Sequence, residues 1–126
     1  DVAIVWGFNA LNYRDQIDKD RFEVVIPSDS SVVSGYANVI NKNAKDPHAA
    51  MLTREYILSD EGQANLARGY ARPIREDVKL PEDAKAKLLP DDMYKNARPV
   101  EDAKAWEEAT KSLPQKWQEE VLVHVN

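Results

Sequence analysis

Hydrophobic residues are distributed differently in the first forty residues and in the rest of the chain. Residues 2–8 form a nearly continuous apolar run, residues 22–26 form a second one, and residues 32–40 form a third that Ser34 and Gly35 interrupt. Short apolar runs of this kind, bounded by Gly, Asn or Pro, are typical of buried strands. We therefore expect short β-strands in this region, separated by a polar loop or helical turn over residues 11–20.

From residue 46 onward the apolar residues recur at helical spacing. Asp46 and Pro47 predict the N-cap and first position of a helix whose apolar face recurs through Ile57. Ser59 predicts the cap of a second helix that ends near Gly69. Gly62, in the first turn of the second helix, has no side chain and would allow the two helices to approach closely.

The last third of the chain is punctuated by prolines, which favour the first turn of a helix. A short helix is expected from Pro81 to Leu89 and a further turn after Pro90. A longer helix is expected after Pro99, and Pro114 is expected to start a final one. The predicted fold class is therefore α/β, with short β-strands followed by several α-helices.

Composition and charge narrow the function classes. The chain has 126 residues, 43% hydrophobic and 31% charged, which is ordinary for one soluble globular domain. Its formal charge is −5, which argues against nucleic acid as a partner. There is no cysteine, so no disulfide or thiolate metal site can form.

Signs of catalysis are missing from the sequence. His48 and His124 are far apart and belong to no metal-ligand motif. The serines of residues 28–34 lie in no G-x-S-x-G motif, and no glycine-rich phosphate loop is present. We therefore predict no catalytic residue, no metal site and no cofactor, and we do not expect an enzyme.

Five residues are candidates for ligand binding. Trp6 and Asn9 lie at the expected end of the first strand, where ligands often bind in α/β proteins. Ser30 and Ser31 offer hydroxyl and backbone donors in a loop, which suits an anion or a polyol. Tyr36 follows Gly35, and a glycine beside an aromatic residue often marks a place where the backbone comes close to another group. Core packing for the aromatic residues and a simple turn for the serines remain open alternatives.

Residues 41–75 carry motifs that resemble a known family. The first motif lies at residues 41–50 and reads NKNAKDPHAA, the second lies at residues 56–63 and reads YILSDEGQ, and the third lies at residues 69–75 and reads GYARPIR. Together they resemble the C-terminal part of an extracellular solute-binding protein of a bacterial ABC importer, with the type II periplasmic-binding fold. The resemblance extends over nearly the whole chain.

This resemblance implies a two-lobed protein with its ligand in the cleft, of which the chain would be the C-terminal part. Residues 1–20 would end the second lobe, residues 21–31 would form the hinge crossover, and residues 32–126 would return to the first lobe, mostly helical after residue 46. The implied function is capture of a small polar or anionic solute in the periplasm or another extracytoplasmic space. The implied partner is the membrane permease of the importer.

Several alternatives stay open from the sequence. A polyamine or a ferric ion could be the ligand, although the Tyr-Tyr pair of ferric-binding members is replaced by Asn12-Tyr13. An enzyme with its catalytic groups upstream is a rival on the same fold. A helical interaction domain that uses Trp106 and Trp117 as contacts is a third possibility. Because unpaired strand edges are adhesive, the isolated chain is also expected to self-associate as a homodimer.

Overall fold

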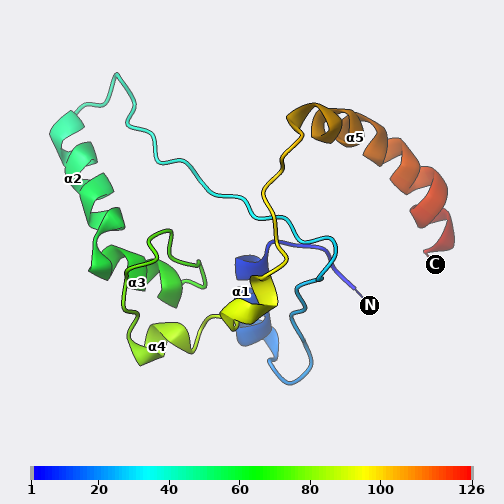
Figure 1. Ribbon diagram of the computed structural model, residues 1–126, viewed down its shortest axis with the longest axis horizontal. Coiled ribbons are helices and arrows are strands. Elements are labelled where there is room, and N and C mark those ends of the chain that lie inside the picture. The colour runs from blue at the N-terminus through cyan, green and yellow to red at the C-terminus, as the bar shows by residue number, and fades with distance from the viewer. Residues whose placement is uncertain (1, 126) are drawn as a thin grey trace.

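Helices separated by long extended segments make up the computed structural model, which describes residues 2–125 (Figure 1). The helices are α1 (Gly7–Ile17), α2 (Pro47–Leu58), α3 (Asp60–Arg68), α4 (Glu82–Lys85) and α5 (Ala103–Lys116). A 3₁₀ turn, η1 (Asp91–Tyr94), follows α4, while a π turn, η2 (Trp117–Val121), and a second 3₁₀ turn, η3 (Leu122–His124), follow α5. Helices α2, α3 and α4 lie together at one side of the molecule, α1 lies near η1 at its centre, and α5 stands apart at the other side.

The α2–α3 hairpin forms as the capping residues predict. The Asp46 carboxylate accepts a hydrogen bond from the backbone N–H of Ala49 at 2.9 Å, and the Ser59 hydroxyl accepts one from Gly62 at 3.1 Å. A Cβ on Gly62 would clash with the carbonyl oxygen of Tyr56 and lie 2.8 Å from that of Ile57. The prediction that Gly62 permits close helix approach is therefore confirmed.

The best-packed part of the chain is centred on α3. Ala64, Ala67 and Ala84 are buried there, together with the side chain of Gln63, which is fully enclosed. The Gln63 amide nitrogen donates to the carbonyl of Ile57 at 2.8 Å, and its oxygen accepts from the N–H groups of residues 74 and 75 at 2.8 and 3.3 Å. One polar side chain thus joins the end of α2 to the extended segment after α3.

The prediction of short strands in the first forty residues is the main one that the structure corrects. Over the described residues, the runs at 2–6, 22–26 and 36–40 join no β-ladder, and residues 7 and 8 open helix α1 instead of ending a strand. The observed strand pairing there is one isolated parallel bridge between Val32 and Arg98. The structure is therefore helix-rich rather than visibly α/β.

The physical reason is that a strand is stable only beside another strand or a covering layer. The molecule exposes 10,696 Å², whereas a compact monomer of 14.3 kDa would expose about 6,800 Å². Apolar residues of the first and third runs, such as Val2 and Val39, are more than 80% exposed, and Val25 of the second is 66% exposed. Nothing within the described residues pairs with these runs, so they stay extended and unpaired.

The last third differs from expectation in its boundaries. Helix α4 ends at Lys85 rather than near Leu89, and α5 begins after Asp102, whose carboxylate accepts from the N–H of Ala105 at 2.9 Å. Pro114 does not restart a helix, because α5 continues through it into the π turn. Among the described residues, none of the helices is both long and apolar enough to cross a membrane.

Candidate functional site

The first turn of α1 holds two of the residues expected to bind ligand. Trp6 is the N-cap residue of the helix, its side chain makes no capping hydrogen bond, and it is 51% exposed. Asn9 lies in the first turn and is partly buried. The first turn contains no acidic residue, and the first intrahelical bond runs from Ala10 to the Trp6 carbonyl at 3.0 Å. The N–H groups before Ala10 therefore present the positive end of the helix dipole.

Aromatic side chains border this turn. The rings of Phe8 and Tyr36 meet edge to face with their centroids 6.3 Å apart, although Tyr36 is 81% exposed. The Tyr94 hydroxyl from η1 lies close to Gly7, 3.8 Å from the place a Cβ would occupy. The structure thus brings Trp6, Asn9 and, through Phe8, Tyr36 to one end of α1.

Tyr94, a neighbour of this turn, and Arg72, which packs on the Tyr94 ring, are residues that the sequence did not single out. Burial raises the pKa of Tyr94 above its usual 10.0, so its hydroxyl stays protonated and able to donate. The Arg72 guanidinium lies 4.4 Å from the Tyr94 ring centroid and donates to Asp91 at 2.5 Å. The available signal was the first Arg of the GYARPIR motif, but Tyr94 is distant from it in sequence and no local pattern indicates their contact.

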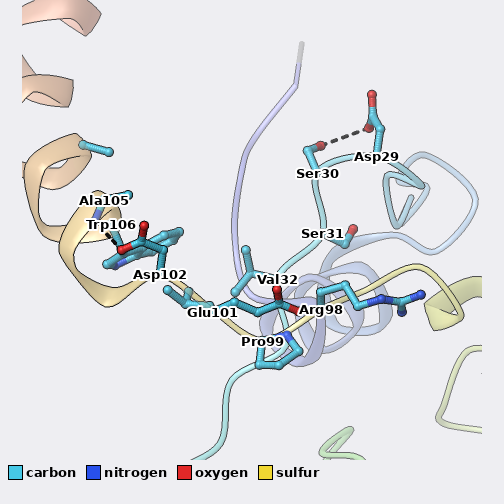
Figure 2. A pocket seen from close by; sticks show the side chains of 12 residues that line it. Asp29, Ser30, Ser31, Val32, Arg98, Pro99, Glu101, Asp102, Ala105 and Trp106 are labelled. Atoms are coloured by element: carbon cyan, nitrogen blue, oxygen red, sulfur yellow. Dashed lines mark hydrogen bonds between the residues drawn. The ribbon is translucent and has the colours of Figure 1, made fainter.

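Ser30 and Ser31 lie in a different place, a shallow groove of about 420 Å³ between their loop and the start of α5 (Figure 2). Ser30 donates its hydroxyl to Asp29 at 3.2 Å, and Ser31 donates to the carbonyl of Pro27 at 2.5 Å. Both hydroxyl protons are therefore used within the loop. The opposite wall carries Trp106, whose indole lies along the groove in Figure 2.

The charge of the groove is mainly negative. Three carboxylates line it, from Asp29, Glu101 and Asp102, against one cation, Arg98. The Arg98 guanidinium points away from Trp106 and donates to the carbonyls of residues 95 and 97 at 2.7 and 3.0 Å. An anion in this groove would meet carboxylates, whereas an ammonium group would find both carboxylates and an indole face.

The five expected residues therefore fall into two groups, one at α1 and one in the groove. Across the part of the chain that the structure describes, no cluster of three or more His, Asp or Glu side chains is arranged to hold a metal ion. The two groups differ in electrostatics, since the end of α1 offers free N–H donors and the groove offers carboxylates.

Comparison with known proteins identifies what the chain resembles. A family model described as bacterial extracellular solute-binding protein matches residues 1–97. The chain is 38% identical over 92 residues to a sulfate-binding protein of Salmonella typhimurium, a match that spans 70% of this chain and 28% of that protein. It is 36% identical over 83 residues to a sulfate-binding protein of Escherichia coli, spanning 62% of this chain and 25% of that protein. The chain thus spans about a quarter of the length of these curated relatives.

Proposed function

The chain belongs to the bacterial extracellular solute-binding protein family, and from this premise we propose that it forms part of the substrate-binding component of an ABC importer for a small oxyanion such as sulfate. The observation that carries the proposal is the match over residues 1–97 together with relatives named for sulfate binding. The proposed location is periplasmic, the proposed partner is a membrane permease, and the protein is proposed to bind its solute without catalysis.

The first turn of α1 supports an anionic solute. Its free N–H groups and the absence of acidic residues favour a negative ligand, as helix N-termini do in general. Trp6 would cover the solute with a flat apolar face, Asn9 would supply an amide donor, and Tyr36 would close the side of the site. Ser30 and Ser31 would add hydroxyl donors from across a hinge after their present bonds are exchanged.

The proposed lobes follow the same family reasoning. Residues 1–20 would complete the second lobe, residues 21–31 would form the hinge crossover, and residues 32–126 would belong to the first lobe of a type II periplasmic-binding fold. In that fold the extended runs of this chain would be strands of α/β lobes. Hydrogen exchange on the product of the complete reading frame that contains this sequence should then protect residues 2–6 and 22–26 strongly.

Calorimetric titration of that product with sulfate tests the function. We expect binding of sulfate and a loss of about tenfold or more in affinity for Ser31→Ala, because a hydrogen bond to a charged group contributes about 1.5–3 kcal/mol. Trp6→Ala, which removes the apolar cover of the solute, should weaken binding as well. Trp117→Ala, which removes an indole outside the proposed site, is the matched control and should bind as the parent does. Failure of the parent to bind any oxyanion would refute the proposal.

A polyamine is the second candidate solute, and the groove beside Trp106 favours it. The groove is lined by the carboxylates of Asp29, Glu101 and Asp102 and by the indole of Trp106, a combination that suits an alkylammonium group. Titration with spermidine under the same conditions separates the two solutes. Binding of spermidine that Trp106→Ala weakens, with no binding of sulfate, would favour this second function.

Self-association of the isolated chain is also proposed. The large exposed apolar area and unpaired extended runs favour contact with a second copy. Light scattering at increasing concentration should give a mass that rises toward a homodimer. A constant mass of one chain at high concentration would contradict this expectation.

A further inference from the structure

The last turn of α1 is anchored to the segment after α3 by a cluster of three charged or polar side chains. The Tyr70 hydroxyl donates to the Asp15 carboxylate at 2.9 Å, and the Lys87 ammonium lies 3.5 Å from the same oxygen. Lys87 also donates to the Tyr70 hydroxyl at 3.4 Å and lies 5.2 Å from the centre of its ring. Residues separated by 55 and 72 positions thus meet at one carboxylate oxygen.

The other oxygen of Asp15 is occupied as well. The Arg14 guanidinium donates to it through Nε at 3.0 Å and through a terminal nitrogen at 2.9 Å. Asp15 is only 21% exposed, and each of its two oxygens accepts from a different set of donors. Because the proton of Tyr70 points to Asp15 while its oxygen accepts from Lys87, the hydrogen bonds run in one direction and strengthen one another.

The backbone at Tyr70 is strained. Its φ is 68°, the left-handed region that bulky residues rarely adopt, while the preceding Gly69 has an ordinary φ of −87°. The glycine expected to relieve the end of α3 therefore does not take the left-handed position. Two backbone hydrogen bonds account for this conformation, from the N–H of Ala71 to the carbonyl of Leu66 at 3.0 Å and from the N–H of Tyr70 to that of Ala67 at 2.9 Å, which together cap the end of α3 as a Schellman motif and direct the Tyr70 side chain away from the helix axis.

Apolar packing holds the C-terminal half of α1 only weakly. Leu11 is its one fully buried residue, Phe8 and Ala10 are partly buried, and Tyr13 and Ile17 at its C-terminal half are more than half exposed. At this end of the helix the polar contacts of Asp15 therefore contribute much of what holds its direction. The anchor at Asp15 lies about two turns from Asn9 and therefore sets the direction in which the first turn points.

We propose that Tyr70 and Lys87 are positioning residues that hold α1, through Asp15, in the orientation that presents its first turn to the solute. This inference rests on the proposed function for the role of the first turn, but the anchor itself rests on the distances above. Neither residue contacts the proposed solute. Tyr70 and Lys87 therefore act on affinity through the helix.

Hydrogen exchange measured by mass spectrometry on the product of the complete reading frame tests the anchor. Tyr70→Phe should speed exchange of α1 amides about tenfold and leave those of α2 unchanged, because it removes the hydroxyl and keeps the ring. Tyr13→Phe, which removes the hydroxyl of a half-exposed tyrosine on the same helix, is the matched control. Lys87→Gln should act in the same direction, with Lys85→Gln as its control and Lys87→Arg restoring the parent behaviour.

Sulfate titration of the same variants supplies the second measurement. We expect Tyr70→Phe to weaken sulfate binding about threefold, with the thermal midpoint of the whole protein nearly unchanged. Tyr70→Asn, which tolerates the left-handed backbone but cannot reach Asp15, should loosen α1 equally, so a folding defect from strain cannot explain the effect.

Unchanged α1 exchange in Tyr70→Phe and in Tyr70→Asn would overturn the anchor, even if the parent binds sulfate normally. Absence of sulfate binding in the parent would refute the proposed function instead, while faster α1 exchange in both variants would still support the anchor. Equal acceleration across α1, α2 and α3 would indicate general destabilisation and would also overturn the proposal.

Discussion

Replacing Gln63 by methionine is expected to loosen the best-packed part of the chain without changing its volume much. The parent side chain is fully buried and makes three hydrogen bonds, two of 2.8 Å and one of 3.3 Å. Methionine fills the space but leaves the carbonyl of Ile57 and the N–H of Ile74 without their partner. The two short bonds contribute about 1 kcal/mol each and the long one less, so we expect a loss of about 2–3 kcal/mol.

Native-state hydrogen exchange of the α3 amides measures this loss as a change in the free energy of opening. Gln115→Met is the matched control, because Gln115 is exposed and bonds only to Glu119 one turn away. A change below about 0.5 kcal/mol in Gln63→Met, or one equal to that of the control, would refute the reasoning.

Gln63→Glu should make the stability of the region around α3 depend on pH. A carboxylate can still accept from residues 74 and 75, but at neutral pH it faces the Ile57 carbonyl with an acceptor instead of a donor. A protonated carboxyl can donate to that carbonyl, so burial and this contact raise the folded-state pKa of the introduced group. The variant should therefore be most stable at acidic pH and lose stability as the pH rises through that pKa.

Three further predictions follow from the contacts of single residues. Gly62→Ala should destabilise the α2–α3 hairpin by about 2 kcal/mol in urea unfolding, because its Cβ meets two backbone carbonyls, whereas Gly35→Ala, with open space around it, should not. Ser59→Ala should lower the helix content by removing a cap contributing about 1 kcal/mol, and circular dichroism with the non-capping Ser112→Ala as control checks this. Arg14, followed by Tyr70 and Lys87, holds the pKa of Asp15 below its usual 3.8. The anchor of α1 should therefore be fully formed above pH 3.8 and be lost on acidification through the lowered pKa. Slower exchange of the α1 amides on acidification, after correction for intrinsic rates, would contradict this.

Helix starts could be predicted from the sequence because each is decided by a few neighbouring residues. Asp46, Pro47 and Ser59 specify the α2–α3 hairpin through contacts no more than three positions away. The match of the family model to residues 1–97 also confirms the resemblance inferred from the motifs of residues 41–75. The helix starts and the family resemblance could both be inferred because each depends on residues close together in the sequence.

Strands and long-range contacts could not be predicted in the same way. The apolar run at residues 2–8 reads as a strand, yet two of its residues begin α1, because strand pairing depends on neighbours that the run itself does not specify. Tyr94 beside Gly7, and Tyr70 beside Asp15, join residues more than fifty positions apart. No local pattern encodes such contacts, so the two groups of candidate residues separated only in the structure.

The isolated bridge between Val32 and Arg98 has a consequence for which surface can bind a solute tightly. Its backbone hydrogen bonds, 2.9 and 3.3 Å long, close a loop of roughly 65 residues, and the entropy of that closure costs about 4 kcal/mol. Two such bonds offset about 2 kcal/mol of this cost. Other contacts offset the remainder, and a ligand that touches both walls of the groove, the serine loop and the start of α5, would stabilise the bridge further. The N–H donors of the first turn of α1 belong to one continuous helix, so contacts with these donors alone do not depend on that bridge.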